Sequence, residues 1–222
     1  MKRSWVLKVV VVLTALLAVG AGGVAWAYPS VAATACPGCY GLSEVTDGVY
    51  AEPGLTPEQR RQVTDTAGEA VRRVTAFYGD RLSSPTMLIC LTEQCYQRLG
   101  GGKEKGVAVL NRAVILSPRG VDPVIASHEL SHVELHARVS ADIPQWLDEG
   151  LAVVVSDDSR YLKPGPGDRC TAEPGAGLPV TLQEWLRAAS ADERTYARAA
   201  CAAWRRLTAE GGVKALITGL DG

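Results

Sequence analysis

The residues best suited to chemistry lie in one short stretch of the chain. His128, Glu129 and His132 form the pattern His-Glu-x-x-His. On a helix, positions i and i+4 lie one turn apart on the same face, so both imidazoles can reach one metal ion. Glu129 can lie beside that ion without binding it and act as a general base on zinc-bound water. The pattern therefore predicts two ligands of one zinc ion and a catalytic carboxylate.

The neighbouring residues favour a helix that carries this pattern. Asp122 and Pro123 supply an N-cap and a first-turn proline just upstream. All three histidines of the chain fall within residues 127–139, and the rest of that stretch is largely apolar, as expected for a helix that crosses a core. The alternative is a helix whose histidines are ordinary core or surface residues, because a five-residue match alone occurs by chance.

A catalytic zinc site needs a third protein ligand and one open position. His136 lies eight residues after His128, about 12 Å along a helix axis, which is too far for one ion held by bonds of about 2 Å. Residues 144–152 open with proline and carry the adjacent acids Asp148 and Glu149 in an apolar run. A carboxylate buried there is costly unless it is paired or bound to a metal. From the residues alone, either acid can be the third ligand.

The two motifs together resemble a known group of enzymes. His128-Glu129-x-x-His132, followed by Trp146-Leu147-Asp148-Glu149-Gly150-Leu151-Ala152, is similar to the gluzincin (peptidase MA-like) zinc metallopeptidases, which include thermolysin and the thermolysin-like aminopeptidases. The resemblance implies that His128, His132 and Glu149 hold one Zn²⁺ and that Glu129 is the catalytic base. Four positions after Glu149, where thermolysin-type enzymes carry an aspartate, this chain has Val153.

The resemblance also bears on the group that stabilises the oxyanion. Many relatives supply a tyrosine or histidine hydrogen-bond donor to that oxygen. Tyr161 and Tyr196 are the tyrosines downstream of the motifs, and Tyr196, on a late predicted helix, suits the resemblance better. Ordinary packing is the alternative role for each of them.

The expected fold class is α+β and zincin-like, with a small mixed β-sheet packed on a helical half and the active-site helix between them. Residues 49–222 are expected to form this metallopeptidase domain, and residues 28–48 a spacer followed by a disulfide-tied loop. Apolar patterning predicts strands at 86–91, 107–110 and 113–116, and helices beginning at 57, 123, 144, 182 and 193. By resemblance, one of the two later strands is the sheet edge beside the cleft, where a peptide can add as another strand.

Residues 1–27 have the features of an export signal. A positively charged start, Met1-Lys2-Arg3, precedes a nearly unbroken apolar run and then the small residues Ala25 and Ala27. Cleavage after Ala27 would release the protein, whereas an uncleaved run from Val9 to Ala27 is long enough to anchor it as a single-pass protein. Both interpretations predict export, either secreted or anchored to the outer face of the cytoplasmic membrane.

Six cysteines agree with an oxidising compartment. Proximity in the sequence suggests three disulfides as a hypothesis, Cys36–Cys39, Cys90–Cys95 and Cys170–Cys201. The Cys36-Pro37-Gly38-Cys39 pair can also be read as a redox or metal pair, but no thioredoxin-like pattern surrounds it.

The charge balance excludes some function classes. The net charge is −1, and removing residues 1–27 takes away three positive charges and leaves −4. No Lys/Arg cluster lies beyond the N-terminus, so no nucleic-acid partner is expected. The predicted function is that of an exported zinc metallopeptidase that hydrolyses peptide or protein substrates. The alternative is a catalytically inactive zinc-bearing binding or envelope-assembly protein. Endopeptidase and aminopeptidase activity both stay open.

Overall fold

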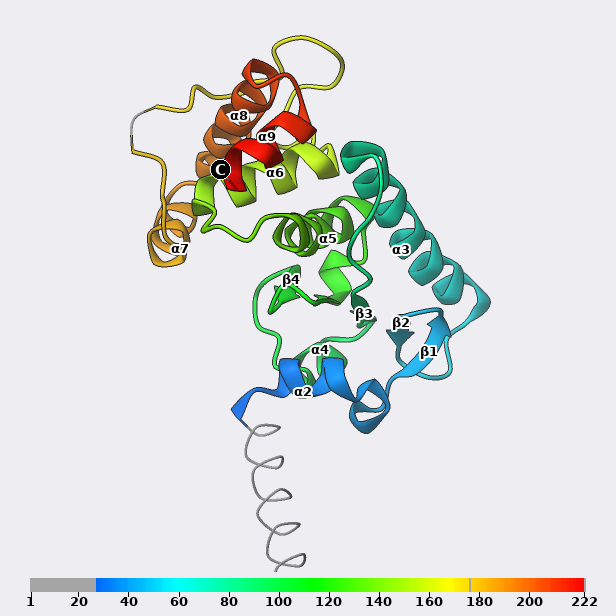
Figure 1. The fold of residues 1–222 in the computed structure, drawn as a ribbon. Coiled ribbons are helices and arrows are strands. Elements are labelled where there is room, and N and C mark those ends of the chain that lie inside the picture. The colour runs from blue at the N-terminus through cyan, green and yellow to red at the C-terminus, as the bar shows by residue number, and fades with distance from the viewer. Residues whose placement is uncertain (1–26, 176, 222) are drawn as a thin grey trace, which may run out of the picture.

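The structure is a computed structural model that describes residues 27–175 and 177–221. It has an α+β architecture in which a small sheet lies below a group of helices (Figure 1). The helices are α2 (Pro29–Ala35), α3 (Pro57–Tyr78), α4 (Glu93–Arg98), α5 (Pro123–Arg138), α6 (Gln145–Ser156), α7 (Leu182–Ala191), α8 (Arg194–Ala209) and α9 (Val213–Asp221), with short 3₁₀ helices η1 (Pro37–Tyr40) and η2 (Pro118–Gly120). The strands are β1 (Ser43–Thr46), β2 (Val49–Ala51), β3 (Thr86–Ile89), β4 (Gly106–Val109) and β5 (Ala113–Leu116).

The sheet is mixed, as predicted, and its strand order is β1-β2-β3-β5-β4. The inner pairs β2–β3 and β3–β5 are parallel, whereas the outer pairs β1–β2 and β4–β5 are antiparallel. All four residues of β5 are buried, and β4 forms one edge of the sheet. The predicted strand 107–110 ends one residue early because Leu110 and Asn111 adopt the left-handed conformation, with φ of 49° and 51°, in the turn to β5.

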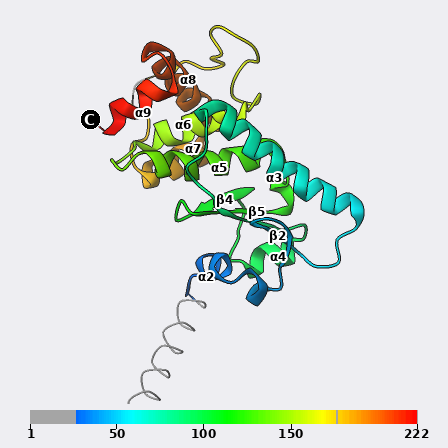
Figure 2. The same ribbon diagram turned by 45° about the vertical axis from the view of Figure 1, so that its right-hand side comes forward.

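Helix α5 lies between the sheet and the helical half. It contacts β4 and β5 on one side and α3 and α6 on the others, an arrangement that both ribbon views show (Figures 1 and 2). Buried side chains of α3, α5 and the sheet form one apolar cluster, and those of α6, α8 and α9 form another. Because α5 is packed on both sides, the position of each of its side chains is tightly constrained.

Residues 28–48, expected as a spacer and a disulfide-tied loop, are part of the folded unit. They form α2, η1 and strand β1. Ala33 of α2 is fully buried in an apolar cluster with residues of β3 and α4, and the Pro29 ring lies so close to Gly100 that a side chain there would collide with it. This segment therefore covers the face of the sheet opposite α5.

The helix starts follow the local signals read from the sequence. The Thr56 hydroxyl and the Gln59 side chain form a reciprocal capping box at the start of α3. At the start of α5, Asp122 accepts a hydrogen bond of 2.7 Å from the Val124 N–H, next to a first-turn proline. This cap fixes where α5 begins, and therefore which of its side chains face the sheet and which face α6.

The structure contains the three predicted disulfides, Cys36–Cys39, Cys90–Cys95 and Cys170–Cys201. The last one fastens the long loop before α7 to the middle of α8. Within the described residues, no helix is both long and apolar enough to cross a bilayer. The predicted span from Val9 to Ala27 lies outside them except for its last residue.

Candidate metal centre

Three side chains from two helices converge at the middle of α5. His128 and His132 lie one turn apart on α5, and Glu149 faces them from α6. Glu149 Oε2 is 3.4 Å from His128 Nε2 and 4.0 Å from His132 Nε2. One potential ligand atom from each residue lies within 4.8 Å of the other two. The three residues chosen by resemblance are therefore brought together.

The donor set fits a zinc ion. Bonds of about 2.0–2.2 Å from imidazole nitrogen and carboxylate oxygen allow two donors roughly 3.3–4.2 Å apart to share one ion. The two nitrogen–oxygen distances fall in this range. The candidate ligand side chains are largely buried yet keep 11–14 % of their surface exposed, so solvent can reach the group. Two imidazoles and one carboxylate with an open position are typical of catalytic rather than structural zinc.

The sequence left Asp148 open as a third metal ligand, but in the structure its carboxylate contacts two histidines instead. Its Oδ1 lies 2.7 Å from His132 Nδ1, and its Oδ2 lies 2.9 Å from His136 Nε2. Both carboxylate oxygens are thus engaged by imidazoles, so Glu149 and not Asp148 is the carboxylate with an oxygen free for a metal. A carboxylate on the second nitrogen of a metal-binding histidine orients the ring and directs its other nitrogen to the metal.

The electrostatics of the site agree with this pairing. Burial lowers the pKa of His132, but the carboxylates beside it, Asp148 above all, together outweigh burial and raise that pKa to about 10. Burial opposes ionisation of Asp148, yet its contacts with His132 and His136 hold its pKa below the ordinary value. The Asp148, Glu149 and Glu129 carboxylates thus favour a proton on His132. A divalent ion can replace that proton, since metal ligands must be deprotonated.

Glu129 lies against the edge strand β4. A side chain at Gly106 would come within 2.8 Å of Glu129 Cγ, so only glycine leaves room for the carboxylate in this position. Burial raises the pKa of Glu129 above its ordinary value, although the two histidines and the Ala108 N–H act in the opposite direction. The carboxylate is therefore held near both the edge strand and the histidine pair.

Tyr196 comes close to the site from α8. Its ring centroid is 6.4 Å from that of His128, it stacks on Tyr161, and it meets Trp185 of α7 edge-on. Helix α8 can approach because Gly150 follows Glu149: a side chain at Gly150 would come within 2.4 Å of a backbone oxygen of α8. Burial raises the pKa of Tyr196, so its hydroxyl keeps its proton and remains a hydrogen-bond donor.

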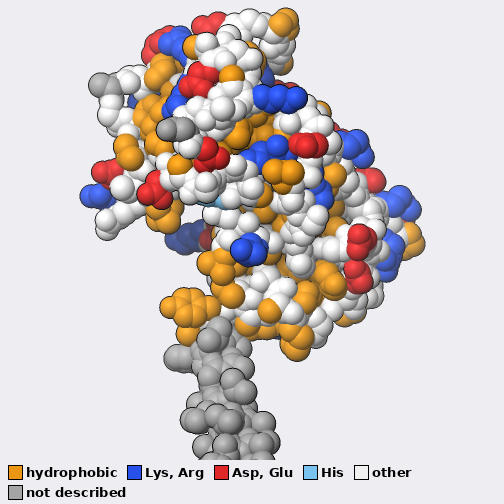
Figure 3. Space-filling view, viewed as in Figure 1, with side chains coloured by type: hydrophobic (Ala, Val, Ile, Leu, Met, Phe, Trp, Pro, Cys, Tyr) orange, Lys and Arg blue, Asp and Glu red, His pale blue; other side chains and the backbone are white. Residues whose placement is uncertain are grey.

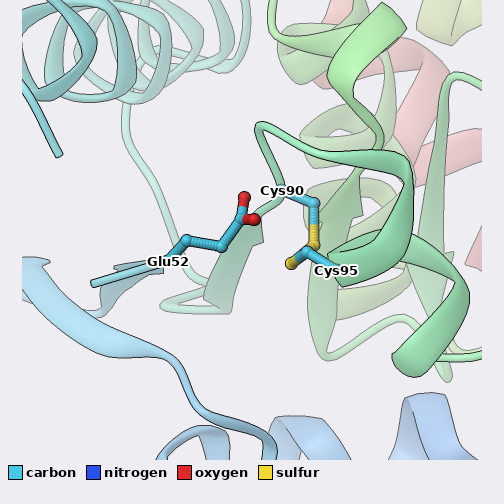
Figure 4. A group of neighbouring side chains, drawn as sticks. All are labelled: Glu52, Cys90 and Cys95. Carbon is cyan, nitrogen blue, oxygen red and sulfur yellow. A yellow bond between two sulfur atoms is a disulfide. The ribbon is translucent and has the colours of Figure 1, made fainter. Parts of the chain in front are cut away.

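A second group of potential ligands lies on the far side of the sheet. Glu52, Cys90 and Cys95 lie close together (Figure 4). The two sulfurs form a disulfide. The Glu52 carboxylate accepts hydrogen bonds from the Leu91 and Thr92 N–H groups and the Thr92 hydroxyl. The disulfide and these hydrogen bonds occupy the potential metal-ligating atoms of this group and hold the start of α4. The group is therefore structural.

No family model matches the chain, and comparison with curated proteins and with solved structures gives no match. The chemistry of the site itself therefore carries the assignment of function.

Sequence reasoning missed two features of this site. It rejected His136 as a ligand on distance, in agreement with its absence from the cluster, but it did not see that Asp148 links His136 to His132. The i, i+4 spacing of His132 and His136 on one helix was the signal that could have revealed this link. The requirement for glycine at 106 had no signal, because it depends on how closely β4 approaches α5.

Proposed function

We propose that this protein is a zincin-like zinc metallopeptidase related to the gluzincins. The observation that carries the proposal is the convergence of His128, His132 and Glu149, with one His132 nitrogen already taken by Asp148. Bound there, a zinc ion would polarise water and the carbonyl of a peptide bond.

The roles of the protein side chains follow from their positions. Glu129 accepts the proton of the attacking water and then donates it to the leaving amine. The raised pKa of Glu129 makes its carboxylate a better proton acceptor than an exposed one. The Tyr196 ring packs beside the candidate ligand His128, and its protonated hydroxyl is the candidate donor to the oxyanion.

We infer that the protein acts outside the cytoplasm. Three disulfides are typical of proteins that fold in an oxidising compartment. Secretion after cleavage at Ala27 and anchoring through residues 9–27 are the two forms of this proposal. Mass measurement of the mature N-terminus separates them: a chain beginning at Tyr28 supports secretion, and one that keeps Met1 supports an anchor.

The experiment that tests the proposal measures cleavage of a broad peptide mixture by the purified protein. We expect chelator-sensitive cleavage that returns when zinc is added. Glu129→Gln should bind zinc as the wild type does and yet cleave nothing above background. Bound zinc with no turnover in the wild type would instead support the inactive zinc-bearing protein, and undiminished turnover in the variant would contradict the role of Glu129.

A further inference from the structure

The two oxygens of the Glu149 carboxylate face different partners. Oε2 lies 3.4 Å from His128 Nε2 and 4.0 Å from His132 Nε2. Oε1 accepts a hydrogen bond of 3.2 Å from the side-chain amide of Gln145. A metal-binding carboxylate must be ionised and can then only accept hydrogen bonds, so the NH₂ group of Gln145 is the part that faces it. One oxygen is thus engaged by the protein, and the other is left for an ion.

Helical spacing brings Gln145 to this carboxylate. Gln145 lies four residues before Glu149 on α6, and side chains at i and i+4 are neighbours on one face of a helix. Val153 lies four residues after Glu149 on the same face, but its buried, apolar side chain has no hydrogen to donate. Of these two neighbours, only Gln145 can engage the second carboxylate oxygen.

The backbone of Gln145 is held by the segment before α7. Helix α6 follows Pro144, which provides no side-chain cap. Instead, the backbone carbonyls of residues 179–180 accept hydrogen bonds of 2.9 and 3.0 Å from the first two N–H groups of the helix. Glu184 fixes that segment in turn by accepting a hydrogen bond from the Thr181 N–H. The first turn of α6, and Gln145 with it, is therefore fixed in place.

Two of the three candidate ligands thus have a polar partner behind them. Asp148 contacts the second ring nitrogen of His132, and Gln145 contacts the second oxygen of Glu149. Such partners orient metal ligands and are needed for tight binding. Without one, a carboxylate is free to turn about its last bond, because the energy minimum of that torsion is broad.

An ion can reach the candidate ligands in the folded protein. All three histidines of the chain belong to α5. A space-filling view shows histidine at the surface, in a hollow between the helical half and the sheet half (Figure 3). Added metal ions and chelators therefore have access to this part of α5, and metal affinity can be measured without unfolding the protein.

We propose that Gln145 is a positioning residue of the metal centre, which holds Glu149 Oε1 through its amide and so presents only Oε2 to the ion. This inference rests on the zinc site of the proposed function, but not on peptide cleavage. A zinc-bearing protein without activity needs the same orientation of Glu149.

The test compares the zinc affinity of the wild type with that of two variants at position 145. Gln145→Met keeps the length of the side chain but has no N–H group to donate, and Gln145→Ala removes the amide without adding bulk. We expect each to weaken zinc binding roughly 10–100-fold in competition with a chromophoric chelator. The melting temperature of the metal-free protein should stay close to that of the wild type.

Gln94→Met is the matched control for this substitution. Gln94 is exposed on α4, on the far side of the sheet. Its variant should bind zinc as the wild type does. An equal loss of zinc affinity in Gln94→Met and Gln145→Met would contradict a specific role of Gln145.

A second background shows whether Gln145 acts through Glu149. Glu149→Ala leaves the two histidines to bind zinc weakly. In that background, Gln145→Met should change the affinity less than about twofold, because the effects of residues that act on one interaction do not add. A loss as large as in the wild-type background would mean that Gln145 acts on the fold of α6 and not on the carboxylate, and would overturn the inference.

Cobalt gives a spectroscopic measure of the same contact. Co²⁺ accepts the same nitrogen and oxygen ligands as zinc, and its visible absorption depends on their number and arrangement. In Gln145→Met, Oε1 becomes free to approach the ion, so we expect weaker visible absorption per bound Co²⁺ than in the wild type. Identical spectra for the two proteins would contradict the claim that the amide keeps Oε1 away from the ion.

The outcomes separate this inference from the proposed function. Equal zinc affinity of the wild type and Gln145→Met would overturn the role of Gln145 and leave the metal centre standing. If the wild type binds zinc but cleaves no peptide, the peptidase is rejected, and loss of zinc affinity in Gln145→Met still supports the positioning role. A wild type that binds no zinc would reject both.

Discussion

Two groups of side chains in this protein bring metal-type donors together, on opposite faces of the same sheet. His128, His132 and Glu149 meet between α5 and α6, and Glu52 meets the Cys90–Cys95 disulfide near α4. In the second group, the two sulfurs share a covalent bond and both Glu52 oxygens accept hydrogen bonds from backbone N–H groups or the Thr92 hydroxyl. In the first, Asp148 occupies only the His132 nitrogen that faces away from the other two residues. Proximity alone does not make a metal site, because donor atoms must also be left free.

Replacing Glu129, the proposed general base, gives the largest expected effect. Glu129→Gln keeps the size of the side chain but removes its ability to accept a proton. We expect peptide hydrolysis to fall by about 10²–10⁴-fold while zinc content and melting temperature stay unchanged. Initial rates on a blocked peptide, measured beside the metal content of the same sample, check this. A rate within a few-fold of the wild type would show that the base lies elsewhere.

The contact that orients His132 should matter next. Asp148→Asn removes the charge that faces His132 Nδ1, and we expect zinc affinity to fall roughly 10–100-fold, as for other carboxylates behind a metal-binding histidine. His136→Gln is the matched comparison, since His136 contacts the same carboxylate but lies outside the cluster, and its effect should be smaller. Competition with a chromophoric chelator measures the zinc affinity of both variants. An equal loss of affinity in the two would argue against His132 as a zinc ligand.

Much of the site was predictable, and the reason lies in where its residues come from. The two histidines and Glu129 follow from the spacing of one helix, and the nearby acids from one apolar run. The choice between Asp148 and Glu149 needed the resemblance, because both carboxylates contact histidines and only the packing of α6 on α5 shows which histidine nitrogens each one meets. The glycine requirement at 106 depends on contact between distant segments, which local patterns do not encode.

In the fold, too, features set by local sequence were predictable, whereas features set by contacts between distant segments were not. Helix starts at Thr56 and Asp122 were predictable because capping is local. Residues 28–48 were expected as a spacer because their Pro, Gly and Ala content is typical of loops, yet burial of Ala33 against the sheet makes them part of the fold. The strand at 107–110 ended early because a left-handed turn at Leu110 is not visible in an apolar run.

A second buried carboxylate on the same helix as Glu129 is expected to contribute to stability and not to catalysis. Glu134 is fully buried and accepts hydrogen bonds from the Leu82 and Ser83 N–H groups and from Arg138. We expect Glu134→Gln to lower the free energy of unfolding by about 2–4 kcal/mol, as for other hydrogen-bonded buried charges. Zinc content per folded molecule should not change, and denaturant unfolding beside metal analysis checks both.

The pH dependence of this effect has a definite sign. Burial opposes ionisation of Glu134, but its hydrogen bonds hold its pKa below the ordinary value of 4.5. The stabilisation by the carboxylate is therefore complete above about pH 4.5 and is lost as the pH falls through the lower, folded-state pKa. Wild-type stability should fall more steeply below pH 4.5 than that of Glu134→Gln. Parallel curves for the two proteins would contradict the lowered pKa.

The smallest effect is expected at the structural group. Glu52→Gln should lower the free energy of unfolding by about 1 kcal/mol, because its hydrogen bonds to the start of α4 weaken. Peptide cleavage and zinc affinity should not change. Thermal unfolding and a zinc titration test this, and a loss of zinc from the variant would mean that this group and not the other holds the metal.

Metal analysis of the purified protein tests the central claim most directly. The wild type and Glu52→Ala should each carry about one zinc per chain, and Glu149→Ala should carry much less after passage through buffer with a weak chelator. A wild type that binds no zinc, or a Glu149→Ala variant that retains it fully, would contradict a metal centre formed by His128, His132 and Glu149.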